Sequence, residues 1–185
     1  MGKEKIRTRE VLQLIGVLGI IVATAAIPSL PMALGAVVKV WKNVNRKDLG
    51  KIIKRLEKQE MISIRENGEQ ITIEITDRGK RRLLEYDFEN IQLKSQKRDG
   101  KWRLVIFDIP EDKKSAREIF RKKLLQLGLI RLQDSVFVSA FPCKKEVDFL
   151  CHYLGISDFI TLLSIDRIER GEELIFKRFT FGDNQ

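Results

Sequence analysis

Cysteine and histidine are scarce in this sequence: its 185 residues include two cysteines, Cys143 and Cys151, and one histidine, His152. A structural zinc site needs four cysteine or histidine ligands, so this kind of metal site is excluded. Secreted domains of this size commonly carry paired cysteines in several disulfide bridges. The low cysteine content therefore predicts an intracellular, cytoplasmic protein.

Acidic side chains are also in short supply, with 26 aspartates and glutamates against 35 lysines and arginines and a net charge of +9. The excess lies in the first half, because residues 1–100 carry 20 basic and 13 acidic side chains. A basic chain favours a polyanionic partner, either nucleic acid or an anionic membrane surface. The hydrophobic content of 43% and the charged content of 33% exclude a disordered chain and a polytopic membrane protein.

Charged residues are absent between Glu10 and Lys39, a run of 28 residues. Within it, Val11–Ile27 is mostly apolar and reaches the lower limit of length for a membrane-spanning helix, about 17 residues. Two interpretations stay open for this segment. It is either the central core helix of a buried domain, followed by a short helix from Pro31 to Trp41, or a membrane contact. The second interpretation would make the protein membrane-associated.

The segment Asn45–Gln59 has the clearest helical pattern in the chain, starting with Asn45 as an N-cap and Asp48 in the first turn. Its apolar residues recur at the i, i+3, i+4, i+7 spacing of one buried stripe. Basic residues occupy the opposite side. The apolar stripe is Leu49, Ile52, Ile53 and Leu56, and the basic residues are Lys47, Lys51, Lys54, Arg55 and Lys58.

A β-hairpin is predicted directly after this helix. Isoleucines alternate with polar residues on both sides of Asn67-Gly68, a dipeptide that favours a two-residue turn. Thr76 then caps a final helix that includes several basic residues. The predicted order over residues 1–91 is helix, helix, basic helix, two-stranded wing and helix.

This order and the phrase ITDRGKRRLLEY resemble winged-helix DNA-binding domains over roughly residues 5–88. The resemblance implies that the basic helix is a recognition helix for double-stranded DNA and that the hairpin reaches an adjacent phosphate. The alternative is that the basic helix is only a solvated surface helix. The DNA-binding residues predicted here are Arg46, Lys47, Lys51, Lys54, Arg55, Lys58 and Arg65.

A second domain is predicted over residues 101–185, after a polar linker at 92–100. Its patterns give a strand Trp102–Ile109, a helix Lys113–Leu127, two short strands, a helix Lys144–Leu154 and a strand Phe159–Ile165. The order βαββαβ is that of a ferredoxin-like domain. A further edge strand is predicted over Glu173–Phe179. The fold class is therefore α+β, a winged helix-turn-helix followed by a ferredoxin-like βαββαβ domain.

The string GKWRLVIFDIPEDKKSAREIFRKKLLQLGLIRLQDSVFVSAF resembles the central domain of the PaaX family of transcriptional regulators, with FDIP, Arg117, LQLG and LQDSVF as matching points. The resemblance covers roughly residues 95–180. It implies a DNA-binding transcriptional regulator of the PaaX-like type that needs no cofactor. Dimerisation through the ferredoxin-like domain is expected, because a homodimer would sum two weak half-site contacts.

The same string resembles, more distantly, CRISPR-associated protein two, the small ferredoxin-fold adaptation subunit. That resemblance implies a metal-dependent endonuclease or adaptation subunit in which Asp108 holds Mg²⁺ or Mn²⁺. The alternative is structural: Asp108 accepts hydrogen bonds from backbone amides of the turn before Pro110. On that interpretation the chain has no catalytic residue.

Overall fold

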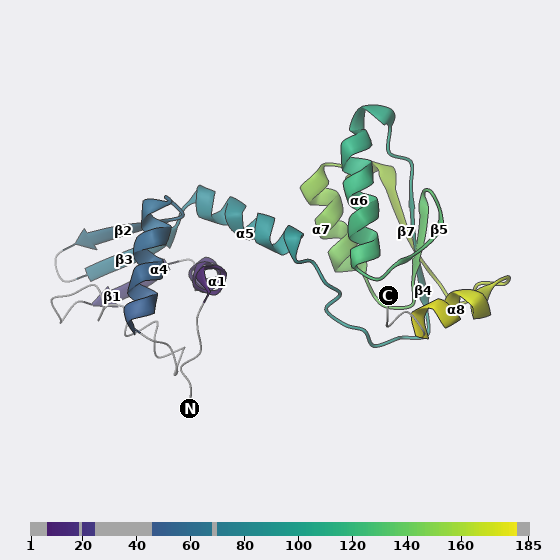
Figure 1. Ribbon diagram of the computed structural model, residues 1–185, viewed down its shortest axis with the longest axis horizontal. Helices are drawn as coiled ribbons and strands as arrows, with labels where there is room; N and C mark the ends of the chain where they lie inside the picture. Colours follow the sequence, from purple (N-terminus) through teal and green to yellow (C-terminus); the bar gives the residue numbers. More distant parts are fainter. Residues whose placement is uncertain (1–6, 19, 25–45, 68–69, 181–185) are drawn as a thin grey trace. The chain divides into compact units, whose positions relative to one another are not determined.

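The computed structural model describes residues 7–18, 20–24, 46–67 and 70–180. The chain divides into two compact units, unit 1 (Met1–Glu89) and unit 2 (Asn90–Gln185), whose elements are labelled in Figure 1. The described parts are α+β, with helices and antiparallel sheets. Each unit has its own sheet and is described by itself.

Unit 1 combines three helices with a three-stranded antiparallel sheet in its described part. The strand order is β1-β3-β2, with β3 paired to both neighbours. The elements are α1 (Thr8–Leu18), β1 (Ile20–Thr24), α4 (Arg46–Lys58), β2 (Ile62–Asn67), β3 (Gln70–Ile75) and α5 (Asp77–Glu89).

The core of unit 1 forms where α4 meets α1 and the sheet. The predicted apolar stripe of α4 is confirmed, because Leu49, Ile52, Ile53 and Leu56 are all buried. They pack in one cluster with residues of α1 such as Leu12 and with isoleucines of β2 and β3. Burial of this stripe fixes α4 so that its opposite, basic side faces solvent.

The interpretation of Val11–Ile27 as one helix is wrong for Ile20–Thr24. Helix α1 ends at Leu18, and Ile20–Thr24 forms β1, which pairs with β3 from Ile20 opposite Glu74 to Thr24 opposite Gln70. The β-branched residues of IIVAT favour a strand, and the backbone of this segment pairs with the edge of β3 that β2 does not occupy. Among the described residues, no helix has the length and apolarity to cross a membrane.

The predicted hairpin is confirmed, with β2 and β3 in antiparallel register from Ile62 opposite Ile75 to Asn67 opposite Gln70. The predicted cap is also confirmed, because the backbone N–H of Gly79 donates to Thr76 Oγ1 at 3.1 Å. Two further expectations, the helix Pro31–Trp41 and the N-cap Asn45, lie outside the described residues.

Gly79 in the first turn of α5 lies against the backbone of Met61. A Cβ atom at Gly79 would lie 2.1 Å from the carbonyl oxygen of Met61, which itself accepts the N–H of Thr76 at 3.1 Å. We expect Gly79→Ala to lower the free energy of unfolding of unit 1 by about 3 kcal/mol, because backbone must move. Urea denaturation followed by circular dichroism would measure this change.

The matched control is Gly50→Ala in α4, since a Cβ there has no neighbour within 4 Å. In a helix interior this change should stabilise unit 1 by about 0.5 to 1 kcal/mol. Equal effects from the two substitutions would contradict the close packing at Gly79.

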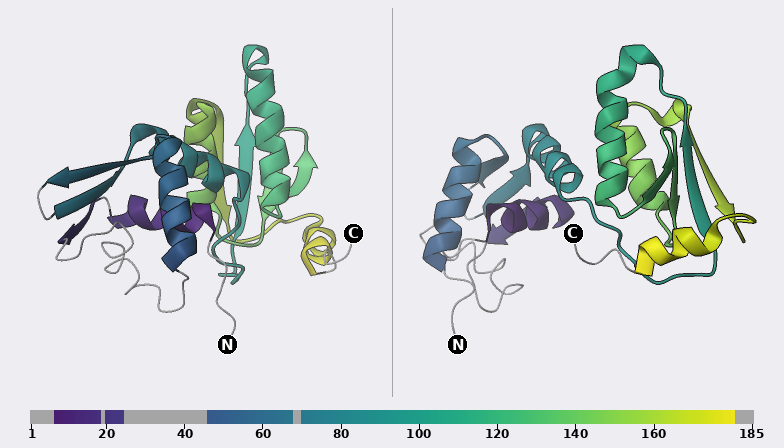
Figure 2. Two further views of the ribbon diagram at one scale, coloured as in Figure 1. Left: turned by 60° about the vertical axis from the view of Figure 1, so that its left-hand side comes forward. Right: turned by 45° about the vertical axis from the view of Figure 1, so that its right-hand side comes forward.

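Unit 2 has a four-stranded sheet of order β5-β6-β4-β7 in which every neighbouring pair is antiparallel. Figure 2 shows α6 and α7 on one face of this sheet. Beneath them, Phe107, Phe120 and Phe137 are buried against one another. The elements are β4 (Trp102–Phe107), η1 (Glu111–Lys113), α6 (Lys114–Gln126), β5 (Ile130–Gln133), β6 (Val136–Ser139), α7 (Lys144–Leu154), η2 (Ser157–Phe159), β7 (Ile160–Ile165) and α8 (Glu172–Thr180).

The predicted edge strand Glu173–Phe179 is wrong, because this segment lies within helix α8. Helical spacing brings Ile175 and Phe179 together against Trp102 on the sheet face opposite α6 and α7. The indole N–H of Trp102 also donates to Glu172 at 2.5 Å. This docking on Trp102 favours the helix over an alternating strand.

The segment 92–100, predicted as a linker, forms no helix or strand. It is nevertheless tied to unit 2. The backbone N–H of Lys94 donates to the buried carboxylate of Glu146 at 3.3 Å, and the Arg103 guanidinium forms an ion pair with Asp99. The Arg103 hydrogen bond lowers the pKa of Asp99 below its ordinary value.

Candidate nucleic-acid interface

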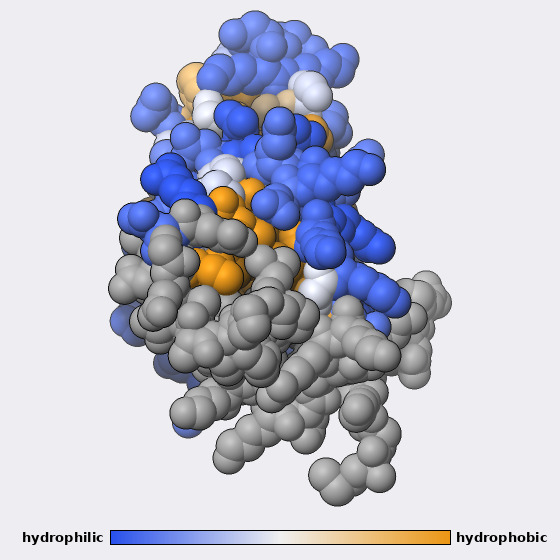
Figure 3. Space-filling model, turned by 90° about the vertical axis from the view of Figure 1, so that its left-hand side faces the viewer, coloured by the Kyte–Doolittle hydropathy of each residue, from blue (hydrophilic) through white to orange (hydrophobic). Residues whose placement is uncertain are grey.

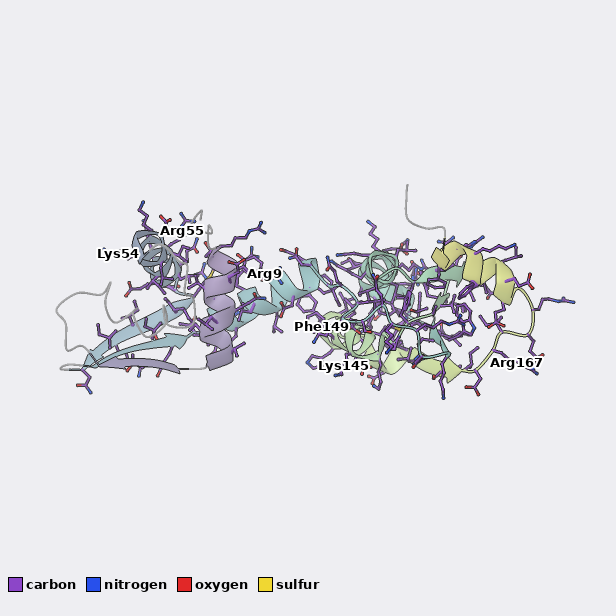
Figure 4. The ribbon with its side chains drawn as sticks, turned by 90° about the horizontal axis from the view of Figure 1, so that it is seen from below. Arg9, Lys54, Arg55, Lys145, Phe149 and Arg167 are labelled. Atoms are coloured by element: carbon purple, nitrogen blue, oxygen red, sulfur yellow. The ribbon has the colours of Figure 1, made fainter. Side chains whose placement is uncertain are left out.

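The outer side of α4 carries a line of cations, here called the α4 stripe: Lys51, Lys54, Arg55 and Lys58. All are exposed, and Figure 4 shows Lys54 and Arg55 projecting from α4. Lys51, Lys54 and Lys58 follow the i, i+3, i+7 spacing of one helix face, with Arg55 at its edge. From Lys51 to Lys58 the stripe extends for about 10 Å along the helix axis.

The α4 stripe is not neutralised by the part of the chain that the structure describes. None of its side chains makes a hydrogen bond or ion pair there, and the exposed Glu57 of the same helix is not paired with any of them. Two pairs of residues four positions apart, Lys51 with Arg55 and Lys54 with Lys58, place like charges side by side. Within the described structure, the stripe therefore presents uncompensated positive charge.

Other basic side chains of unit 1 do have acidic partners. The pairs are Arg9–Asp87 (3.5 Å), Arg65–Glu74 (4.0 Å), Arg78–Glu60 (3.0 Å), Lys80–Asp77 (3.0 Å) and Arg82–Glu85 (2.7 Å). Hydrophilic side chains cover much of the described surface in the view of Figure 3. Among the described residues of unit 1, α4 is the helix that carries several unpaired cations on one face.

Two of the predicted DNA-binding residues, Arg46 and Lys47, begin α4, but their side chains lie outside what the structure describes. Arg55 is therefore the residue of the α4 stripe whose planar guanidinium could form two hydrogen bonds to one guanine. Lysine contacts to phosphates position a helix on the duplex without reading its sequence.

Arg65 is not brought next to the α4 stripe. It lies in β2 opposite Thr72, and its neighbours Ile62 and Ile64 pack into the core that contains α4. Because successive strand residues point to opposite faces, Arg65 is on the sheet face away from α4. Its side chain is 74% exposed and 4.0 Å from Glu74, a long and weak pair.

Asp108 follows the end of β4. Its backbone N–H donates to the carbonyl of Phe159 at 3.0 Å, but its exposed carboxylate makes no hydrogen bond or ion pair with a described residue. The expected acceptance of backbone amides from the turn is therefore wrong. The turn is held instead by Arg117, which donates to the carbonyl of Ile109 at 3.0 Å and to Glu111 at 2.7 Å. Hydrogen bonds from Arg117 and Lys114 lower the pKa of Glu111.

One carboxylate does not fit a magnesium or manganese site by itself. Hard cations of this kind take about six oxygen ligands, and the protein usually supplies more than one carboxylate. No group of three or more His, Cys, Asp or Glu side chains that could hold a metal is found among the described residues. The described part of one protomer therefore does not form a metal site around Asp108.

Sequence reasoning missed the role of Arg117 in fixing this turn, although the residue belongs to the PaaX-like string. Arg117 lies in α6, six residues after Glu111 in η1. The pair therefore does not have the i, i+3 or i, i+4 spacing by which ion pairs within one helix are predicted. The contact of the half-buried Arg117 guanidinium with the end of a strand is visible only in three dimensions.

Comparison with family models matches residues 95–174 to the "PaaX protein central Cas2-like domain". The matched segment covers all of β4 through β7 and the start of α8. No curated protein matches this chain. The match confirms the resemblance found in the string that begins at Gly100.

Proposed function

We propose that this chain, whose residues 95–174 match the PaaX protein central Cas2-like domain, is a DNA-binding transcriptional regulator that acts as a homodimer. The observation that carries the proposal is the α4 stripe, which has no acidic partner among the described residues, whereas most other basic side chains described in unit 1 have one. Uncompensated lysines on a fixed helix attract phosphates and release the counterions condensed on DNA.

The order of elements in unit 1 supports a winged-helix domain. Helix α1 and strand β1 precede α4, and β2 and β3 follow it as a hairpin whose inner strand also pairs with β1. In this architecture α4 is the recognition helix, and its exposed stripe enters the major groove. The core stripe of α4 holds the helix against the sheet during binding.

The α4 stripe fits a short stretch of one DNA strand. Phosphates of one strand recur about every 3.4 Å along the duplex axis, so a 10 Å stripe spans about three of them. Such contacts give affinity that depends strongly on salt and little on sequence. Any base preference would come mainly from Arg55, since lysines act as point charges.

Homodimerisation through the ferredoxin-like unit 2 is supported by its sheet. The face opposite α6 and α7 is here called the open face, and α8 covers only its end around Trp102, Val138 and Ala140. Next to that end, Ile106, Val136 and Leu163 are half-buried or exposed, with Leu163 at 41%. A solvated sheet face is commonly polar, so this apolar face fits a second copy.

The experiment that tests the proposal is a binding titration of a labelled random duplex by fluorescence anisotropy at several salt concentrations. We expect the logarithm of the binding constant to fall linearly with the logarithm of salt, with a slope of about −3 to −4 per protomer. Binding that does not respond to salt would contradict the phosphate contacts.

The match of residues 95–174 to a Cas2-like domain makes a metal-dependent nuclease the second candidate. Its metal ligand would be Asp108, whose exposed carboxylate has no partner among the described residues. Because one carboxylate is a poor metal site, we expect labelled DNA and RNA to stay intact with Mg²⁺, Mn²⁺ or EDTA. We also expect Asp108→Ala to bind DNA like the unchanged protein. Cleavage that requires both the metal and Asp108 would favour the nuclease.

A further inference from the structure

A groove among the described residues of unit 1 lies between α1, β3 and α5, with a volume of about 990 Å³. Its floor is apolar and includes Gly16, Ile75 and Leu83. Its walls carry two large exposed apolar side chains, Val17 at 84% and Leu84 at 47%. Exposed apolar side chains along one groove are typical of a docking surface.

The groove is built into the packing of the two helices. An added Cβ at Gly16 would lie 2.6 Å from Cδ1 of Leu83, so α1 and α5 approach closely at its floor. At one end, Asp87 of α5 accepts long contacts of 3.5 Å from Arg9 and from Gln13 of α1. None of the residues of the α4 stripe lines it.

Charges are arranged on the exposed side of α5 in a way that suits a copy of itself. Lys80, Leu84 and Asp87 follow the i, i+4, i+7 spacing of one helix face, with the cation on one side of Leu84 and the anion on the other. Along the helix axis, Lys80 lies about 6 Å from Leu84 on one side, and Asp87 lies about 4.5 Å from Leu84 on the other side. Lys80 and Asp87 remain exposed despite their contacts within the chain.

We propose that two copies of this chain pack α5 against α5 in antiparallel orientation across this groove, with a two-fold axis at Leu84. In a two-fold interface the same patch meets itself, so a residue at position i contacts j and j contacts i. The antiparallel pair places Lys80 opposite the partner's Asp87, at nearly equal distances from the axis. Leu84 and Val17 of both copies fill the groove between them.

This contact goes beyond the proposed function because it sets the geometry of the two DNA-binding units. A contact of a few helix turns is too small to hold a dimer by itself. The open face of unit 2 supplies the affinity, and the α5 contact fixes the separation of the two α4 stripes. Fixed separation of two recognition helices selects one half-site spacing on the duplex.

Leu84→Cys in the full chain tests the contact, since a residue on the two-fold axis faces its own copy. The native thiols are not expected to cross-link. Cys143 and Cys151 are buried, and burial raises their pKa values to about 11 and about 12. Under mild oxidation without DNA, we expect the disulfide-linked dimer to form at least about tenfold faster than with the control Gln59→Cys. Gln59 is exposed and outside the groove.

The second measurement is the rate of cross-linking in Leu84→Cys proteins in which the charges of Lys80 and Asp87 are also reversed. Lys80→Asp alone or Asp87→Lys alone places like charges opposite each other and should slow cross-linking severalfold. The double exchange restores opposite charges across the axis and should restore the rate. Equal rates for Leu84→Cys and Gln59→Cys, or no recovery in the double exchange, would overturn the contact. Because DNA is absent, either result leaves the role of α4 untouched.

Discussion

The double variant Lys51→Glu, Lys54→Glu is expected to bind duplex DNA roughly tenfold to hundredfold more weakly than the unchanged protein at moderate salt. Both side chains are exposed, lie on one helix face and have no acidic partner among the described residues. Removing two phosphate contacts should also lower the salt slope by about 2 for each bound protomer. Anisotropy titrations between 50 and 300 mM salt, about the range where such effects appear, measure both quantities.

The matched control is Lys122→Glu, Lys145→Glu in unit 2, which changes the net charge equally at two exposed lysines. If net charge alone governs binding, the two double variants will behave alike. If α4 is the interface, the control keeps most of its affinity and its salt slope. An unchanged affinity for the α4 variant would reject α4 as the DNA-binding helix.

Leu163→Arg on the open face of unit 2 is expected to convert the proposed homodimer into a monomer at micromolar concentration. Leu163 pairs with Leu104 across β7 and β4, and a charge there would be buried against apolar side chains of the second copy. Loss of the second half-site should reduce DNA affinity by about a hundredfold and roughly halve the salt slope. Light scattering and anisotropy would follow the two effects.

Leu125→Arg is the control, because Leu125 is 53% exposed on α6, on the helical side of unit 2. Both variants place arginine at an exposed leucine, so a general loss of solubility or folding would affect them alike. A Leu163→Arg protein that stays dimeric would show that the open face is not the dimer interface.

The parts of the fold that could be predicted from sequence are those in which local pattern and burial agree. The α4 core stripe has a pure helical period, the hairpin strands alternate isoleucine with polar residues, and Lys144–Leu154 matches the bounds of α7. In each case the residues that must be buried are close in sequence. Their spacing alone is enough to choose between helix and strand.

The predictions that failed concern segments whose structure is decided by distant neighbours. The residues of β1 continue the apolar run of α1, and only pairing with β3, about fifty residues later, makes them a strand. The segment of α8 alternates well enough for a strand, but docking on Trp102 favours a helix. Tertiary contacts of this range override local propensity.

The candidate site, too, has one feature that local spacing predicts and another that depends on distant residues. The spacing of the lysines in α4 is readable from sequence, but whether a cation is neutralised is not. Arg9 finds Asp87 and Arg78 finds Glu60 across long stretches of chain, whereas the α4 stripe finds no such partner in the described structure. The sequence likewise does not show that the Asp108 carboxylate lacks a hydrogen-bond partner among the described residues. The structure shows it, because Arg117 holds the turn in its place.

The unneutralised cations of α4 also bear on the thermal behaviour of the free protein. Like charges one helical turn apart repel, so in dilute buffer α4 is strained by its own electrostatic self-repulsion. Dissolved ions shield that repulsion. Adding sodium chloride should therefore raise the melting temperature of unit 1. The same salt weakens the proposed complex with DNA, so it stabilises the fold and destabilises the complex.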